Sequence, residues 1–436
     1  MFASYRRLFA LPGALAFTLS GLLGRLAFSM TGVSTVLLVT ARRDSYALAG
    51  AVTAVGTVAT ALGLPLLGRL VDRYGQRRVA RPGVLCALGP LLGLPLCAYT
   101  GAPAWTLLLC AAAASVLPNL GGMARARWAH LLRADPAARQ TANSFEQVLD
   151  ELCFTAGPVL GTLLCTTLLP EAGLLAAAAL GCTGTLLFAA QRRTEPPVTP
   201  AADRATNGAL RVGGLRVLVP AFFAAGLVFG SIEVSTVAYA DAAGQRPLAG
   251  GLLAMMAAGS AVSGLLLGLA RPRRSPAARL LAGAAAMAAL LLLPLAAGLA
   301  GAGPWLLAPA LLLAGAGTAP TMVAGLSLVQ ELVPAGQLNE AMGLTVSGIL
   351  AGISTGAALG GTLAQHTTGA GTAAPGLGYA LPAGAALLAL LTVLLGYRRL
   401  RPAAAAPGQT YSYSATVVPS GSTRGRSAVR TPPSRS

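Results

Sequence analysis

Twelve long runs of residues with little or no charge constrain this chain more than any other feature of its sequence. Each run is long enough to cross the hydrocarbon core of a bilayer as a helix, which takes about 20 apolar residues. Helices satisfy their own backbone hydrogen bonds in lipid, so they are the expected form of such runs. We therefore predict an all-α integral membrane protein with twelve transmembrane helices. The runs lie near 12–38, 47–68, 82–100, 104–124, 143–165, 171–190, 214–239, 247–270, 277–299, 303–326, 341–363 and 377–397.

The composition supports a membrane protein and excludes two other classes. Hydrophobic residues make up 55% of the 436 residues and charged residues only 10%. Soluble domains carry about 25% charged residues, so a soluble fold is excluded. The net charge of +18 does not indicate a nucleic-acid partner, because the 31 basic residues are all arginine and fall in alternate loops. A nucleic-acid domain would gather them on one face, and here the predicted partner is the lipid bilayer.

The arginines also predict the orientation of the chain. They cluster in the loops after the second, fourth, sixth and eighth runs, whereas the loops on the other side hold few. Basic loops tend to stay on the cytoplasmic side, so we predict a multi-pass protein with both termini in the cytoplasm. An all-arginine chain rich in Ala, Gly and Leu is associated with GC-rich bacterial genomes. We therefore predict that the membrane is the bacterial cytoplasmic (inner) membrane.

A polar, proline-containing segment divides the apolar part of the chain near its middle. An internal repeat supports this division, because Gly68 and Trp105 recur as Gly268 and Trp305 in similar surroundings. The C-terminal tail is rich in Pro, Ser, Thr and Arg and has no apolar period, which is typical of disorder. The predicted parts are an N-terminal six-helix half (1–190), a cytoplasmic linker (191–213), a C-terminal six-helix half (214–400) and a disordered basic cytoplasmic tail (401–436).

The stretch from Gly68 to Val79 reads GRLVDRYGQRRV and joins the second run to the third. Its spacing, Gly-x-x-x-Asp-Arg-x-Gly-x-Arg-Arg, resembles the signature loop between helices 2 and 3 of the major facilitator superfamily of secondary transporters. Gln76 departs from the pattern, because the family usually has a basic residue there. A merely basic turn is the alternative interpretation, but such a turn has no need of Asp72.

The resemblance implies roles for this motif and a fold for the chain. In the family, the first glycine lets two helices approach, and the aspartate and arginine tie the two halves together on the cytoplasmic side. The implied fold has two parallel six-helix halves around a central cavity. The predicted cytoplasmic gating motif comprises Gly68, Asp72, Arg73, Gly75, Arg77 and Arg78.

Three further residues are candidate gating partners of the motif. Arg125 and Arg127 lie near the cytoplasmic end of helix 4, within expected reach of Asp72 or Glu146. They are equally well explained as positively charged anchors at the membrane surface. Glu340 falls in the first turn of helix 11, where an acid suits the positive end of the helix dipole. By resemblance, Asp72 favours the same helix start in the outward-facing state, which makes it a candidate latch.

Four ionisable side chains fall inside the predicted spans, where a charge costs about 2.5–3.5 kcal/mol at the bilayer centre. They are Arg25 in helix 1, Asp150 and Glu151 in helix 5 and Glu233 in helix 7, and Glu146 shares a face with Asp150 one turn away. We predict that these five residues form the substrate or proton pathway, and that Arg25 pairs with Asp150 or Glu151. The alternative is a buried structural ion pair that contacts no substrate. The resemblance adds a central cavity surrounded by helices 1, 4, 7 and 10, which Arg25 and Glu233 would line.

Helix 5 also contains Gly157, Pro158 and Gly161, which resemble the end of the Gly-Pro motif in helix 5 of the family's exporters. In that motif, a kinked surface with few side chains packs at the interface between the halves. The match is partial, because Cys153 and Thr162 stand where the motif has glycine. The alternative is that the three residues only kink the helix and allow close packing.

No motif for catalysis, nucleotide binding or metal binding is visible in the sequence. Without lysine, the chain cannot form a G-x-x-x-x-G-K-[ST] phosphate loop. The two histidines are far apart, and the six cysteines fall within apolar runs, where they are expected to pack as small apolar groups. We therefore predict no enzyme activity, no cofactor and no metal site.

The predicted function is secondary active transport of the major facilitator type, by alternating access. We expect export of a small organic compound in exchange for protons. Proton-coupled uptake on the same fold is the first alternative, and a non-transporting membrane scaffold or receptor is the second. The sequence indicates neither a particular substrate nor an oligomeric state.

Overall fold

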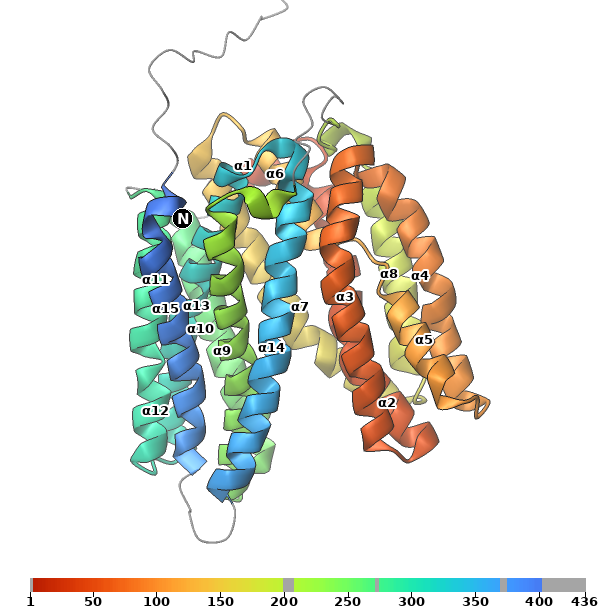
Figure 1. The fold of residues 1–436 in the computed structure, drawn as a ribbon, viewed down its shortest axis with the longest axis vertical. Coiled ribbons are helices and arrows are strands. Elements are labelled where there is room, and N and C mark those ends of the chain that lie inside the picture. Colours follow the sequence, from red (N-terminus) through yellow and green to blue (C-terminus); the bar gives the residue numbers. More distant parts are fainter. Residues whose placement is uncertain (1–2, 199–207, 271–273, 369–374, 402–436) are drawn as a thin grey trace, which may run out of the picture. The chain divides into compact units, whose positions relative to one another are not determined.

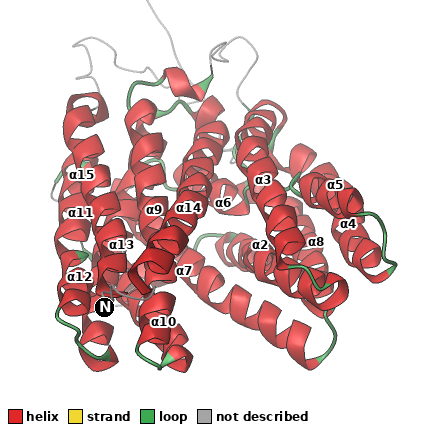
Figure 2. Cartoon of the chain, turned by 60° about the horizontal axis from the view of Figure 1, so that its bottom comes forward, coloured by secondary structure: helices red, strands yellow, loops and turns green. Residues whose placement is uncertain are grey.

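The structure, a computed structural model, describes residues 3–198, 208–270, 274–368 and 375–401. Residues Met1–Arg401 form one compact unit. Every element that Figure 2 draws within the described ranges is a helix or a loop. Of the predicted parts, the middle of the linker and nearly all of the tail lie outside the described residues.

The helices fall into two groups in chain order, which we call the first set and the second set (Figure 1). The first set, with the short helix that precedes it, comprises α1 (Ala3–Phe9), α2 (Ala14–Arg43), α3 (Tyr46–Tyr74), α4 (Gln76–Tyr99), α5 (Ala104–Ala114), α6 (Leu120–Leu131), α7 (Pro136–Thr167) and α8 (Ala172–Ala190). The second set comprises α9 (Leu215–Ala242), α10 (Ala249–Leu269), α11 (Pro276–Leu290), α12 (Leu292–Leu299), α13 (Pro304–Leu332), α14 (Leu338–Thr368) and α15 (Ala380–Leu400). Short 3-10 turns lie at Arg192–Thr194, Ala209–Arg211, Arg246–Leu248, Ala335–Gln337 and Pro375–Tyr379.

Among the described residues, 11 helical segments are long and apolar enough to cross a membrane, with α11 and α12 counted as one segment. The shorter apolar helix Ala104–Ala114 is α5. Together with α6 it covers the remaining predicted run, near 104–124. The predicted all-α fold with twelve transmembrane helices is therefore confirmed.

The span predicted near 104–124 is not one continuous helix. α5 ends at Ala114 and α6 begins at Leu120, and Pro118 lies in the break. Proline has no N–H and disfavours the helical conformation of the residue before it. Asn119 then caps α6, because its Oδ1 accepts a hydrogen bond from Gly122 N at 3.0 Å. The break places the start of α6 beside α2.

The turn between the second and third spans is much shorter than the sequence suggests. α3 and α4 extend into it from both sides, and only Gly75 separates them. Gly75 has a φ of +93°, a conformation that glycine adopts without the steric strain of other residues. Arginine is a good helix former, so the basic residues continue both helices beyond their apolar parts. The motif residues therefore lie on helix ends.

Many pairs of helices pack together within each set, whereas only a few pairs of helices join the two sets. α2 packs against α7 and α8, and α9 packs against α14 and α15. Glycines permit the closest approach, as at Gly230, where a Cβ would overlap the Ile353 carbonyl of α14. Between the sets, α3 contacts α14, and α7 contacts α10 and α13. The division into two six-helix halves stays a prediction.

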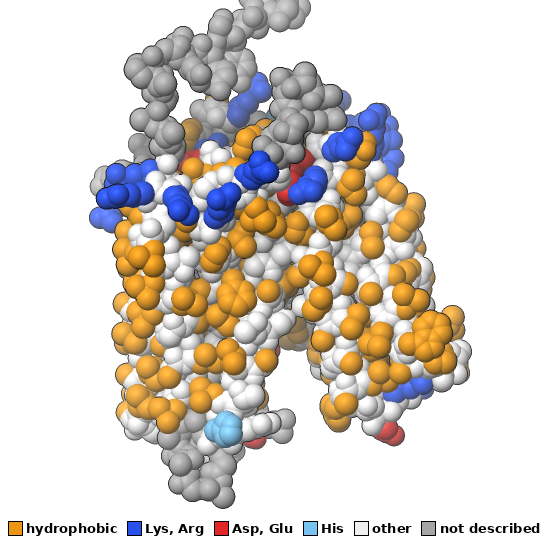
Figure 3. Space-filling view, viewed as in Figure 1, with side chains coloured by type: hydrophobic (Ala, Val, Ile, Leu, Met, Phe, Trp, Pro, Cys, Tyr) orange, Lys and Arg blue, Asp and Glu red, His pale blue; other side chains and the backbone are white. Residues whose placement is uncertain are grey.

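Basic side chains gather at one end of the Met1–Arg401 unit, as Figure 3 shows. We call this end, which carries the α3–α4 turn and the described parts of 191–213, the arginine end. Large apolar side chains such as Leu62, Leu66 and Leu395 are exposed on the sides of the bundle, as expected for surfaces that face lipid. Figure 3 also shows a hollow between the two sets that widens away from the arginine end.

Candidate functional site

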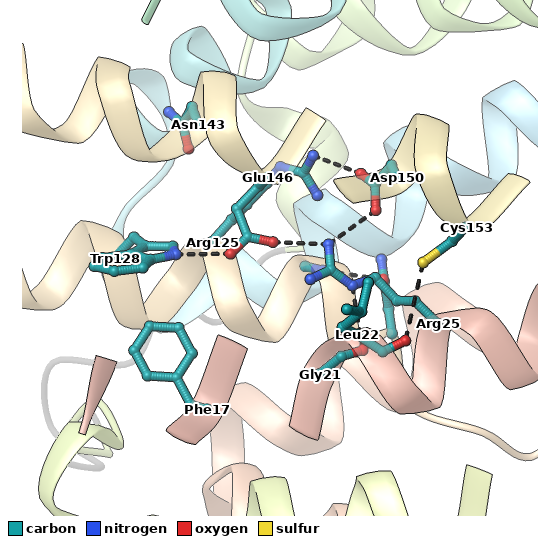
Figure 4. A network of polar contacts seen from close by, with 12 residues as sticks. Phe17, Gly21, Leu22, Arg25, Arg125, Trp128, Asn143, Glu146, Asp150 and Cys153 are labelled. Atoms are coloured by element: carbon teal, nitrogen blue, oxygen red, sulfur yellow. Dashed lines mark hydrogen bonds and ion pairs between the residues drawn. The ribbon is translucent and has the colours of Figure 1, made fainter. Parts of the chain in front are cut away.

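Four charged side chains from three helices of the first set form a buried group, which we call the charge cluster: Arg25 on α2, Arg125 on α6, and Glu146 and Asp150 on α7. Arg25 Nη1 lies 2.7 Å from Glu146 Oε2 and 2.9 Å from Asp150 Oδ1. Arg125 Nη2 lies 2.6 Å from Asp150 Oδ2. The two arginines therefore share Asp150, as Figure 4 shows.

The charge cluster is almost closed to solvent. Arg25, Arg125 and Glu146 are 8%, 4% and 0% exposed, and the Asp150 side chain is 22% exposed. Two guanidinium groups and two carboxylates sum to zero net charge, which lowers the cost of keeping charges in a low-dielectric interior. Removing one carboxylate would leave a buried arginine uncompensated, which costs about 3–5 kcal/mol.

Local features of the sequence build the charge cluster. Glu146 and Asp150 are one helical turn apart and face the same side of α7. Trp128 on α6 donates from Nε1 to Glu146 Oε1 at 2.7 Å, which leaves the other carboxylate oxygen for α2. Gly121 leaves room for the arginines, because a Cβ there would already lie 3.3 Å from Arg125 Nη1.

Asp72, near the end of α3, caps the start of α14. Its Oδ1 accepts hydrogen bonds from Asn339 N at 3.0 Å and Asn339 Nδ2 at 2.7 Å, and its Oδ2 accepts from Glu340 N at 2.9 Å. A carboxylate is favourable there, because the first N–H groups of a helix lack intrahelical partners and form the positive end of its dipole. Gly68 allows the approach, since a Cβ there would overlap the Asn339 carbonyl. We call this contact the α3–α14 connection.

Glu340 extends the α3–α14 connection to the predicted linker. Its Oε1 lies 2.7 Å from Arg69 Nη2 and accepts a hydrogen bond from Ala209 N at 3.2 Å. At the other described end of the linker, Glu195 Oε1 accepts from Arg77 N at 2.9 Å, at the start of α4. Both described ends of the linker are therefore docked on the helix bundle.

A second contact between the sets, which we call the α7–α10 connection, joins α7 and the short helix α1 to the end of α10. Thr141 Oγ1 on α7 donates to the carbonyl of Gly268 at 2.8 Å. The Tyr5 hydroxyl of α1 donates to the carbonyl of Leu265 at 2.8 Å. Both donors are neutral, and both acceptors are carbonyl groups near the C-terminal end of α10.

The fold and the α3–α14 connection agree with what a comparison to known protein families finds. The profile of the Major Facilitator Superfamily matches residues 17–302. The chain belongs to the Major Facilitator Superfamily. A curated superfamily relative, "Uncharacterized MFS-type transporter y4rN" of Sinorhizobium fredii (strain NBRC 101917 / NGR234), is 27% identical over 392 residues. The match covers 84% of this chain and 92% of the relative.

Solved structures of superfamily transporters share the fold. A bacterial homologue of the iron transporter ferroportin, in an outward-facing state, has a TM-score of 0.71 and 16% identity over 88% of this chain and 99% of its own. The human organic anion transporter MFSD10 (TETRAN) has a TM-score of 0.66 and 19% identity over 89% of this chain and 100% of its own. The E. coli fucose:proton symporter FucP has a TM-score of 0.63 and 15% identity over 89% and 99%. At such identities, these likenesses concern the fold alone.

Two acids predicted for the transport pathway lie outside the charge cluster. Glu151 faces the second set, where Ser260 Oγ on α10 donates to its Oε1 at 2.8 Å. Glu233 is exposed on α9 and forms no hydrogen bond or ion pair with a described residue. Arg25 pairs with Asp150, and Glu151 is not its partner. The roles of all these residues in transport stay predictions.

Arg125 and Arg127 are expected within reach of Asp72 or Glu146, and among the described residues neither arginine forms an ion pair with either carboxylate. Arg125 pairs with Asp150. Arg127 is fully buried and donates from Nε to Gln76 Oε1 at 2.8 Å and from Nη2 to the Phe188 carbonyl at 3.1 Å. Phe188 lies near the C-terminal end of α8, where a cation is favourable. Gln76, the position that departs from the family pattern, thus holds a buried arginine.

The remaining residues of the motif differ in burial. Gly75 is buried at the turn, and Arg77 is half-buried at the start of α4. Arg73 and Arg78 are exposed at the arginine end. Their gating role stays a prediction.

The glycines of helix 5 pack within the first set. Gly157, Pro158 and Gly161 all lie inside α7, which continues through the proline. A Cβ at Gly157 would overlap Ser29 of α2, and one at Gly161 would lie 2.8 Å from Ser34 Oγ of α2. These glycines therefore hold α7 against α2, whereas the resemblance to exporters implies a surface between the halves. A kink at Pro158 stays a prediction.

Sequence reasoning missed several residues that support the site. Trp128 is fully buried and donates a hydrogen bond to Glu146, a contact that the sequence does not indicate. Asn339 stands just before the predicted helix 11, a place where asparagine is a helix-start signal that could have pointed to it. Tyr5 gives no such signal, because its partner is 260 residues away.

Proposed function

We propose that this superfamily member is a secondary active transporter that exports a small organic compound across the bacterial cytoplasmic membrane in exchange for protons. Both termini would face the cytoplasm, which makes the arginine end the cytoplasmic end. The observation that carries the proposal is the charge cluster, because it is a buried set of titratable groups within helices that span the membrane.

A proton can enter the charge cluster only by changing its contacts. If Asp150 is protonated, the two arginines keep a single carboxylate, that of Glu146, and the cluster gains one positive charge. An uncompensated buried charge costs several kcal/mol unless helices move or solvent or substrate enters. Proton binding is therefore linked to the positions of α2, α6 and α7.

The charge cluster is connected to the second set through α7. Glu151 follows Asp150 directly and accepts a hydrogen bond from Ser260 of α10. Thr318 Oγ1 on α13 donates in turn to Ser260 Oγ at 3.0 Å. A shift of α7 on protonation would therefore act on α10 and α13. Rocking of one helix set against the other is the motion by which such folds alternate access.

The α3–α14 connection would serve as the cytoplasmic gate. It joins the two sets at the arginine end, and Figure 3 shows a hollow at the opposite end. This arrangement supports a state that is closed to the cytoplasm and open to the outside. Opening the gate would break the hydrogen bonds of Asp72 and expose the start of α14.

Everted membrane vesicles test the proposal. Respiration acidifies their lumen, and a pH-sensitive dye follows the loss of the gradient when compounds from a panel of small organic molecules are added. A transported compound should collapse the gradient in vesicles that contain the wild-type chain. Asp150→Asn keeps the shape of the side chain but removes the proton site, so it should reduce the signal to that of vesicles without the protein.

Asp135→Asn is the matched control. Asp135 is exposed and caps α7, and asparagine caps a helix as well as aspartate does. This variant should keep the wild-type signal. Proton movement that survives in Asp150→Asn would remove Asp150 from the mechanism.

Proton-coupled uptake is a second candidate. The solved structures that share the fold include the E. coli fucose:proton symporter and the proton:xylose symporter XylE. Right-side-out vesicles separate the two directions, because a symporter would make the external medium alkaline when its substrate is added. That result, with no response in everted vesicles, would favour uptake over export.

A further inference from the structure

A cavity of about 90 Å³ lies beside the charge cluster. Residues of α2, α4 and α8 line most of its walls, Leu64 of α3 and Val346 of α14 add to them, and the break between α5 and α6 lines one end. Arg25 belongs both to the charge cluster and to the cavity wall. The volume is several times the roughly 10–15 Å³ that one water molecule needs, so a small organic group can enter.

Two residues that line the cavity each have a nitrogen donor without a described partner. Arg25 is 8% exposed, and its Nη2 has no partner among the described residues. The buried Asn119 Nδ2 also lacks a described partner. At the start of α6, Asn119 Oδ1 accepts from Gly122 N, and the first N–H groups of a helix have no intrahelical acceptor. These donors favour a ligand group that accepts hydrogen bonds.

Most of the remaining wall is apolar. Leu88 and Leu91 of α4 line the cavity, together with Leu117 at the break and Phe28 of α2. Moving a hydrocarbon group from water onto such a wall is favourable in free energy. The ligand therefore combines an acceptor group with a short hydrocarbon chain.

The charge cluster determines which ligand charge fits. Arg25 is already balanced by Glu146 and Asp150, and the four charges of the cluster sum to zero. An anion bound to Arg25 would add an uncompensated negative charge to a buried site, and a cation would face hydrogen-bond donors. An uncharged head group with an acceptor oxygen avoids both costs.

We propose that this cavity binds the uncharged, carbonyl-bearing end of a small organic compound, such as a carboxamide, ketone or ester with a short hydrocarbon chain. The carbonyl oxygen accepts hydrogen bonds from Arg25 and Asn119, and the chain packs on α4 and α8. Most of the cavity wall belongs to the first set, and Val346 of α14 adds one residue of the second set. This inference rests on the proposed function in one respect, that the bound ligand is the transported substrate.

Two cysteines provide the test in the full-length protein. Cys182 lines the cavity and is half-buried, whereas Cys86 is exposed and is not part of the cavity wall. The purified protein is treated with methyl methanethiosulfonate, and peptide mass spectrometry gives the rate of modification at each thiol. Butyramide is the probe, and butyrate and butylamine are its negatively and positively charged counterparts with chains of the same length.

Butyramide should slow the modification of Cys182 by at least about tenfold at saturation and leave Cys86 unchanged. Butyrate and butylamine should need concentrations at least about tenfold higher for the same protection, because each buries an uncompensated charge. Gly181→Val should abolish protection by filling the cavity, since a Cβ at Gly181 meets only Ala27, at 3.4 Å. Gly384→Val adds the same volume to α15, where nothing lies within 4 Å, and should leave protection unchanged.

Better protection by butyrate or butylamine than by butyramide would overturn the proposal. Wild-type protection in Gly181→Val would overturn it as well, and so would a Cys182 that does not react at all, because the cavity would then be closed to small molecules. Compound-dependent proton movement in vesicles without protection of Cys182 would overturn the site and leave the transport function standing. Protection without proton movement would support the site and count against the transport function.

Discussion

The α3–α14 and α7–α10 connections, two of the contacts between the helix sets, use opposite chemistry. At the α3–α14 connection, the carboxylate of Asp72 accepts hydrogen bonds from N–H groups at the start of a helix. At the α7–α10 connection, the hydroxyls of Thr141 and Tyr5 donate to carbonyl groups at the end of a helix. The first helix end carries a partial positive charge and is met by an anion, whereas the second carries a partial negative charge and is met by neutral donors.

The same contrast appears at the glycines that recur in the internal repeat. A Cβ at Gly68 would overlap backbone atoms of Asn339, whereas the nearest atom at Gly268 is the hydroxyl of the Tyr5 side chain. A side chain can rotate away, but a backbone moves only if the two helices separate. We therefore expect the α3–α14 connection to respond to small changes as a gate does, and the α7–α10 connection to tolerate them as a hinge does.

A methyl group at Gly68 should have the largest effect. Gly68→Ala would force α3 away from the Asn339 carbonyl, and overpacking of this kind costs about 3 kcal/mol. Hydrogen–deuterium exchange at the start of α14, followed by mass spectrometry, should accelerate by about a hundredfold. In Gly268→Ala, Tyr5 can rotate away and Ser144 Cβ, 3.0 Å from the added methyl group, needs only a small shift, so exchange at either connection should change by less than about tenfold. Equal effects of the two substitutions would contradict the distinction between gate and hinge.

Asp72→Asn should have an intermediate effect. It keeps the size of the side chain, but its amide nitrogen cannot accept a hydrogen bond, so the charge and one of the two accepting oxygens are lost. Loss of a charge-assisted hydrogen bond costs about 1.5 kcal/mol. We expect exchange at the start of α14 to rise by about tenfold, with little change at the end of α10. Lost transport with unchanged exchange would mean that Asp72 does not act by capping α14.

Removing the Tyr5 hydroxyl should have the smallest effect. Tyr5→Phe deletes one neutral hydrogen bond, which contributes about 1 kcal/mol. Exchange near Leu265 should rise by about fivefold, and exchange at the start of α14 should stay at the wild-type rate. Thr141→Val deletes another neutral donor of the α7–α10 connection and serves as the matched variant. If Tyr5→Phe opened the start of α14 as much as Asp72→Asn does, the two connections would be one cooperative unit.

For the candidate site, the sequence identified residues better than it identified their neighbours. Arg25, Glu146 and Asp150 are conspicuous because charges are rare in apolar runs, and helical periodicity places the two acids on one face of α7. The participation of Arg125 could not be predicted in the same way. Its position depends on the break at 115–119, which lets α6 start beside α2.

The glycines of α7 show the same limit. Helical spacing places Gly157 and Gly161 on one face and indicates that this face packs closely against another helix. The spacing does not show which helix that is. The resemblance to exporters implied a helix of the other half. In the structure the neighbour is α2, since Ser29 and Ser34 fill the space beside the two glycines.

The sequence by itself determined how many segments cross the membrane, where they lie and which loops carry the arginines. Each apolar segment satisfies its own backbone hydrogen bonds in lipid, so it becomes a helix whatever its neighbours are. The resemblance to the family already pointed to Asp72 at the start of α14, whereas only the tertiary structure decided that two arginines share Asp150 and that a cavity lies beside Arg25. These contacts join residues far apart in the chain through the fit of small side chains between helices, and no local pattern encodes that fit.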